Sequence, residues 1–139
     1  MTRIPRAWLA GSLVVLAGCA PAVESLRPAA NAPNLIGEWK GQWGGLDEHR
    51  QPIGHPIRLV IGQHVATKVA GNVTSFPHHR PPATDEMTGA VGTRHDGSIW
   101  VYASTVGGVD FRLKVVSDRR LEGEGIARNH TGPVVLTRE

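Results

Sequence analysis

Apolar and polar residues alternate with a period of two over much of the chain after residue 35. In the segment 109–115, VDFRLKV, the apolar side chains of Val109, Phe111, Leu113 and Val115 fall on one face, and charged side chains fall on the other. Because successive side chains of a strand point to opposite faces, this pattern predicts a strand that is buried on one side. Glycine recurs too often in the same region for an ordinary helix.

Short segments of this kind repeat along the chain, and turn signals separate them. They predict strands over 35–43, 56–62, 65–74, 86–93, 98–104, 108–117, 120–128 and 133–138. The tetrapeptide GQHV at 62–65, the pentapeptide RHDGS at 94–98 and the tetrapeptide SDRR at 117–120 are the expected hairpin turns. Eight short antiparallel strands predict an all-β domain, either an eight-stranded up-and-down barrel or a strongly bent β-sandwich.

Three of the predicted strands carry a glycine two residues after an apolar residue. The pairs are Val69/Gly71, Met87/Gly89 and Leu121/Gly123. A glycine on the inward face of successive strands lets a small barrel bend sharply, so the repetition favours a barrel, although a chance repeat in a glycine-rich chain is the alternative.

The N-terminal region lacks this alternation and has the layout of an export signal. Arg3 and Arg6 precede an uncharged apolar run of twelve residues, 7–18, which is too short to span a hydrocarbon core of about 30 Å as a helix. The run ends in Leu16-Ala17-Gly18-Cys19, which resembles the lipobox of bacterial lipoproteins. The resemblance implies cleavage before Cys19 and acylation of its thiol. Ala20 after the cysteine favours the outer membrane, with the domain facing the periplasm of a bacterial envelope.

These features divide the chain into three parts. Residues 1–18 are the expected signal peptide, 19–34 an Ala/Pro-rich flexible tether that carries the lipid, and 35–139 the β-barrel domain. Charged residues on the outer face of the predicted strands indicate a soluble domain that is held at the membrane by its lipid alone.

The first predicted strand carries a second resemblance. Its sequence LIGEWKGQW, with Gly37 and Trp39, is similar to the Gly-x-Trp strand that opens calycin-type barrels, the lipocalins and avidins. The resemblance implies a β-barrel in which Trp39 packs at the closed end. It transfers no ligand-binding residue.

Composition excludes several classes of function. Cys19 is the one cysteine, so neither an intramolecular disulfide nor a cysteine-based zinc site can form. The formal charge of +3 includes Arg3 and Arg6 of the signal, and the remaining basic residues are scattered, which argues against a nucleic-acid partner. Motifs for nucleophilic catalysis, phosphate loops and dinucleotide cofactors are absent from the sequence, so we expect a non-enzymatic protein without an organic cofactor.

The histidines supply a candidate binding surface. In a simple meander the loops 44–55, 75–85, 105–107 and 129–132 meet at one end of the barrel. This end would collect the candidate rim residues His49, His55, His78, His79, Arg80 and His130, with Arg50, Asp85 and Glu86 nearby. Such a rim could bind a small molecule or protein, hold Zn²⁺ or Cu²⁺ through imidazoles, or consist of solvated loop residues. The spacing His49-x5-His55 and the adjacent pair His78-His79 match no tight metal motif.

A second candidate surface lies on the strand 98–104. Trp100 and Tyr102 share one face and Ile99 and Val101 the other, so one apolar face must lie outside the core. That face would either contact a partner or be covered by the N-terminal segment.

Taken together, these features predict a lipid-anchored, non-catalytic binding module for a small molecule or protein. The alternatives are a structural accessory that contacts another envelope protein and a metal-binding protein.

Overall fold

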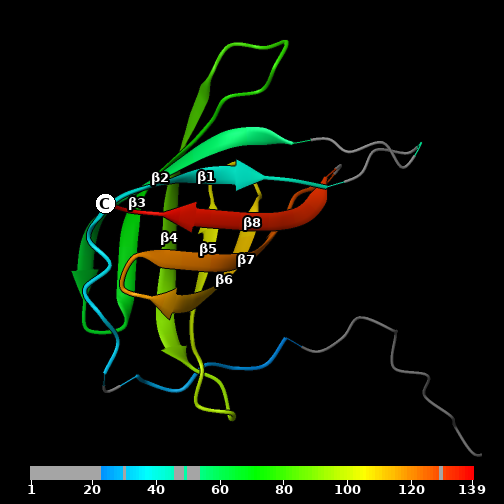
Figure 1. The fold of residues 1–139 in the computed structure, drawn as a ribbon. Helices are drawn as coiled ribbons and strands as arrows, with labels where there is room; N and C mark the ends of the chain where they lie inside the picture. The colour runs from blue at the N-terminus through cyan, green and yellow to red at the C-terminus, as the bar shows by residue number, and fades with distance from the viewer. Residues whose placement is uncertain (1–22, 30, 46–48, 50–53, 129) are drawn as a thin grey trace, which may run out of the picture.

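Eight antiparallel strands form a closed barrel in which neighbours in the chain are neighbours in the sheet (Figure 1). The computed structural model describes residues 23–29, 31–45, 49, 54–128 and 130–139. The strands are β1 (Gly37–Trp43), β2 (His55–Val65), β3 (Lys68–Ser75), β4 (Ala83–Thr93), β5 (Ile99–Thr105), β6 (Asp110–Ser117), β7 (Arg120–Ile126) and β8 (Thr131–Thr137). The predicted up-and-down barrel is confirmed. The β-sandwich alternative is wrong, because β1 pairs with both β2 and β8 and leaves no open edge.

Two of the three predicted hairpin turns are confirmed, at 94–98 and at 117–120, and Gly97 adopts a φ of 85° in the first of them. The turn predicted at 62–65 is wrong. The β2 strand continues to Val65, and Ala66 and Thr67 form the turn. The register between β2 and β3 shifts between Ile61 and Gln63, so a β-bulge at Gly62 accommodates the residue that had been interpreted as the start of a turn.

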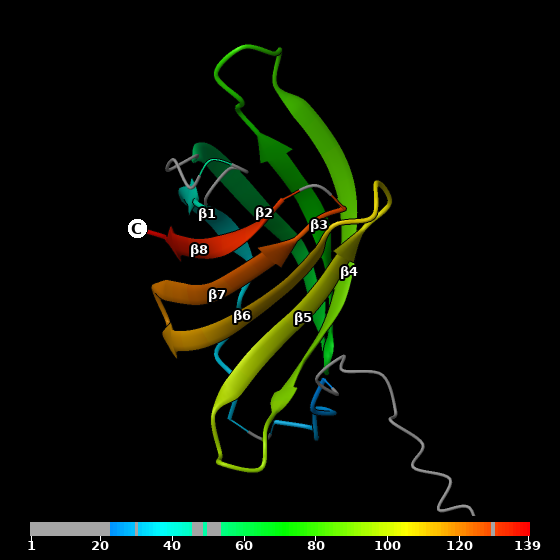
Figure 2. The same ribbon diagram turned by 90° about the vertical axis from the view of Figure 1, so that its right-hand side faces the viewer.

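The strand β4 also begins earlier than predicted, at Ala83 and not at residue 86. Ala83 pairs with Ser75 of β3, so the connection between the two strands is shorter than the expected 75–85 loop. This pairing brings Asp85 and Glu86 into the sheet. The β3 and β4 strands with their connection project beyond the rest of the barrel in Figure 2.

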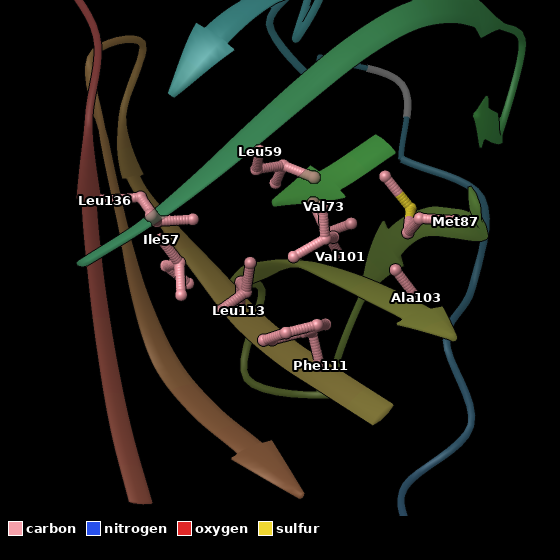
Figure 3. Close-up of a pocket in the computed structure, with 9 residues that line it drawn as sticks. All are labelled: Ile57, Leu59, Val73, Met87, Val101, Ala103, Phe111, Leu113 and Leu136. Carbon is pink, nitrogen blue, oxygen red and sulfur yellow. The ribbon is translucent and has the colours of Figure 1, made fainter. Parts of the chain in front are cut away.

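The barrel interior is filled by apolar side chains from all eight strands. Figure 3 shows nine of them around a residual cavity of about 10 Å³: Ile57, Leu59, Val73, Met87, Val101, Ala103, Phe111, Leu113 and Leu136. A cavity of this size holds at most one water, and apolar cavities stay dry. The interior is therefore a packed core and offers no space for a ligand.

The inward-facing glycines predicted from the repeated pattern lie between buried residues of their strands, such as Val69 and Val73 around Gly71. A Cβ atom added at Gly71 would lie 1.8 Å from the carbonyl oxygen of Val60 on β2, and one at Gly123 would lie 1.8 Å from that of Arg112 on β6. The neighbouring backbones thus approach more closely than any side chain allows. These glycines permit the tight coiling that closes a small barrel.

The segment before β1 contacts the barrel over part of the expected tether. Arg27 exchanges two backbone hydrogen bonds with Thr93, of 2.9 and 2.7 Å. Nearby, the carboxylate of Glu24 accepts hydrogen bonds from the backbone N–H and the side chain of His95. These polar contacts hold Glu24 and Arg27, two residues of the expected tether, against the β4–β5 hairpin (Figure 1). Cys19 and the expected signal peptide, 1–18, lie outside the described residues.

The end of the barrel at which β1 begins is closed by Trp39, which is fully buried and donates from Nε1 to the carbonyl of Leu35 at 3.0 Å. The guanidinium of Arg138 lies 4.4 Å from the centre of the Trp39 ring and donates to the carbonyls of Asn34 and Ile36. These contacts give Trp39 a structural role at this end of the barrel.

In the described part of the chain, no helix has the length and apolarity needed to cross a membrane.

Candidate binding groove

The connections after β1, β3, β5 and β7 lie at one end of the barrel, as the meander predicted. At this end, parts of three connections and the adjoining strand ends enclose an open groove of about 710 Å³, here called the rim groove. It is lined by Trp43, Gly54, His55, Ser75, Pro77, His78, His79, Arg80 and His130.

Five of the six predicted rim residues therefore come together: His55, His78, His79, Arg80 and His130. His49 is an exposed turn residue and does not line the groove. Arg50 lies outside the described residues. Asp85 is directed elsewhere, because its carboxylate accepts a hydrogen bond of 2.5 Å from the backbone N–H of Gly107.

The floor of the groove is Trp43, the last residue of β1, which sequence reasoning did not place in the site. Its ring lies 4.6 Å from that of His130, 5.4 Å from that of His55 and 5.6 Å from that of Phe111, centre to centre. The ring packing follows from the sheet, since Trp43 pairs directly with His55 across β1 and β2. Edge-to-face packing of this kind fixes the ring orientations.

Two nitrogen atoms of this cluster are buried without a hydrogen-bond partner among the described residues: Nε1 of Trp43 and Nε2 of His130. Trp43 is only 6% exposed. A buried polar atom without a partner costs about 1–3 kcal/mol, and such atoms are few in folded proteins. Two of the three such atoms among the described residues thus belong to residues that line the rim groove, and the third is Nε of Arg58.

The groove environment favours the neutral form of the His55 imidazole. Burial lowers the pKa of His55 below its ordinary value, and the nearby His130 and His78 lower it further. One nitrogen of His78, Nε2, lies 2.7 Å from the carbonyl oxygen of Gly54, which can only accept, so this nitrogen donates the hydrogen bond. His55 is therefore uncharged at neutral pH, and the His78 ring is fixed in orientation.

The metal alternative finds no geometric support. Within the described ranges, no group of three or more His, Cys, Asp or Glu side chains is arranged to hold a metal ion. The rings of His55 and His130 lie 6.0 Å apart and are tilted by 46°.

The second predicted surface, Trp100 and Tyr102, lies on the outside of β5, because Val101 and Ala103 between and beyond them are buried. The guanidinium of Arg94 lies 3.5 Å from the centre of the Trp100 ring, and its Nε donates to the Tyr102 hydroxyl at 2.9 Å. Nε1 of Trp100 donates to the hydroxyl of Ser98. The polar atoms of Trp100 and Tyr102 thus have hydrogen-bond partners in the protein. By contrast, Nε1 of Trp43 and Nε2 of His130 have none among the described residues.

Comparisons with known proteins give neither a family nor a function for this chain. No protein-family model matches the chain, and no curated protein is significantly similar to it. Among solved structures it is similar to a redesigned β-barrel, at 14% sequence identity over 76% of this chain and 91% of that chain, with a TM-score of 0.49. The assignment to closed eight-stranded antiparallel barrels rests on the strand pairing itself.

Proposed function

We propose that this protein is a non-catalytic binding module and that its ligand, a small molecule or a short protein segment, sits in the rim groove. The observation that carries the proposal is the rim groove itself, a hollow of about 710 Å³ in which four imidazoles gather and the rings of His55 and His130 pack against Trp43. A concave site with ring surfaces and a few converging polar groups is the usual place for a small ligand.

The filled core limits where such a ligand can lie. Because the residual internal cavity is about 10 Å³, binding takes place at the mouth and not inside the barrel. The volume of about 710 Å³ is within the range of roughly 300–1,000 Å³ that is usual for small-molecule sites.

The buried, hydrogen-bonded Trp39 also supports a calycin-like relationship, which we retain as part of the proposal.

We further propose that the domain is lipid-anchored through Cys19 in a bacterial envelope, at the outer membrane and facing the periplasm. The basic start, the apolar run and the cysteine in register support this assignment. When the full-length chain is produced in bacteria fed an alkyne-bearing fatty acid, we expect label on the wild type and none on Cys19→Ser. Label retained on Cys19→Ser would contradict the proposal.

The indole N–H signals of the protein provide a direct test of the rim groove. In a ¹⁵N-tryptophan sample, we expect ligands from a library of anionic, cationic and neutral small molecules and short peptides to shift the Trp43 signal. The Trp39 and Trp100 signals serve as internal controls, because their Nε1 atoms are already hydrogen-bonded.

The double variant His78→Ala/His79→Ala should weaken such a ligand, since both side chains line the groove, while leaving the fold intact, since both residues are exposed. His95→Ala, which removes an exposed imidazole at the opposite end, is the matched control and should leave the affinity unchanged. A library at millimolar concentration that shifts no Trp43 signal would rule out the rim groove as a binding site.

A further inference from the structure

We infer that the rim groove takes a small organic anion, with its carboxylate or phosphate group at the Arg80 side and its apolar part against the aromatic and imidazole rings. This inference rests on the proposed function and names the class of its ligand. It is drawn from the charge of the lining, the neutral donor of Ser75 and the packing of the histidines.

Among the described residues, the groove lining carries one permanent positive charge and no carboxylate. The charged side chain is that of Arg80. Arg80 is absent from the ion pairs found among the described residues. A guanidinium presents a planar set of donors that matches the two oxygens of a carboxylate or the oxygens of a phosphate.

The groove lining also offers a neutral donor to an anion. The hydroxyl of Ser75, which lines the groove, can donate a hydrogen bond to a carboxylate or phosphate oxygen.

The histidines allow the groove to adjust its charge to an anion. His55 faces His130 from the β7–β8 connection, His78 from the β3–β4 connection and Trp43 from β1, and none of these is negatively charged. Its pKa is lowered in the unliganded protein by burial and by its imidazole neighbours. An anion favours the protonated imidazole, so its binding raises the pKa of His55 and draws in a proton. By reciprocity, the anion binds more tightly as the pH falls through the pKa of His55.

The shape of the groove adds the apolar requirement. Imidazole rings and Pro77 make up much of the wall, and the Trp43 ring lies beneath them. These surfaces favour a ligand with a flat hydrocarbon part over a fully hydrated inorganic ion.

Three flat probes of the same shape and different charge test the inference. We expect the full-length protein to bind benzoate at least tenfold more tightly than neutral benzamide or cationic benzamidine in calorimetric titrations. Benzoate should bind more tightly at pH 6 than at pH 7.5, and titrations in buffers of different ionisation enthalpy should show proton uptake. Phenyl phosphate and inorganic phosphate distinguish a carboxylate from a phosphate preference and an organic anion from a bare one.

Arg80→Gln should weaken benzoate by about tenfold, because it removes a charged hydrogen-bond donor. Arg119→Gln, in the β6–β7 turn at the opposite end, should leave the affinity unchanged.

Binding of benzamide or benzamidine as tight as that of benzoate, or full affinity in Arg80→Gln, would overturn the anion assignment. The rim groove would then remain a site for another class of ligand. Inorganic phosphate that binds as tightly as phenyl phosphate would overturn the organic part, and absence of binding by every anion would overturn the whole inference. The proposed function itself fails only if the wider library also leaves the Trp43 indole signal unshifted.

Discussion

Replacing Gly71 by alanine is expected to lower the free energy of unfolding by about 3 kcal/mol or more, at the upper end of what overpacking usually costs. The added Cβ would lie 1.8 Å from the carbonyl oxygen of Val60 and 2.8 Å from its carbonyl carbon. These atoms belong to the backbone of β2, which is paired with β3 along most of its length, so they cannot move aside alone. Relief would require opening the β2–β3 register at the point where the barrel bends.

Gly62→Ala is the matched control for this experiment. Gly62 lies on the same hairpin, at the bulge of β2, and an added Cβ there would meet nothing within 4 Å. We expect a change below about 0.5 kcal/mol for this exposed position. Urea unfolding of both variants measures the difference, through the midpoint at constant slope. Equal and small effects would contradict the view that close backbone approach at Gly71 closes the barrel.

Replacing Trp39 by alanine should cost about 3–5 kcal/mol, the range for a large aromatic residue removed from a core. Trp39 is fully buried, and three kinds of interaction meet on it. Its ring packs in the core, its Nε1 donates to Leu35, and the Arg138 guanidinium lies over its face. The loss therefore affects the core and also the segment before β1, whose carbonyls Arg138 holds.

Trp39→Phe separates these contributions. It keeps an apolar ring and removes the N–H donor, so its cost should be smaller than that of alanine by at least about 1 kcal/mol, given what a buried ring is worth. Trp100→Ala, on the outside of β5, is the control for loss of an indole as such and should cost less than Trp39→Ala. A thermal or urea unfolding experiment in which Trp100→Ala proves the more damaging would show that the closed end is not held by Trp39.

The fold was accessible from the sequence because its signals are local and repeated. Alternation such as that of Val109 to Val115 sets which side chains face the core, and a turn such as Asp96-Gly97 fixes where a strand reverses. The errors occurred where a local signal has two meanings. Gly62 with Gln63 looks like a turn, but the same residues form a bulge inside a longer strand, and only the pairing with β3 distinguishes the two.

The rim groove was accessible in part for the same reason. Once the meander is assumed, strand order alone places His55, His78, His79 and His130 at one end. What strand order cannot give is the depth of each side chain. Trp43 becomes the floor because it ends β1 on the inward face, and its partnerless nitrogen follows from three-dimensional packing with Phe111 and His130. The contact of Glu24 with His95 likewise could not be predicted from local sequence patterns, because the two residues are 71 positions apart.

The contacts of Glu24 and Arg27 with the β4–β5 hairpin have a consequence for how the protein is presented. They fix the incoming chain at the end of the barrel opposite the rim groove (Figure 2). Strands of seven residues at about 3.3 Å per residue separate the two ends by roughly 20 Å. A probe or surface attached directly at Glu24 would therefore sit on the far side of the barrel from the rim groove, with the length of the barrel between the two.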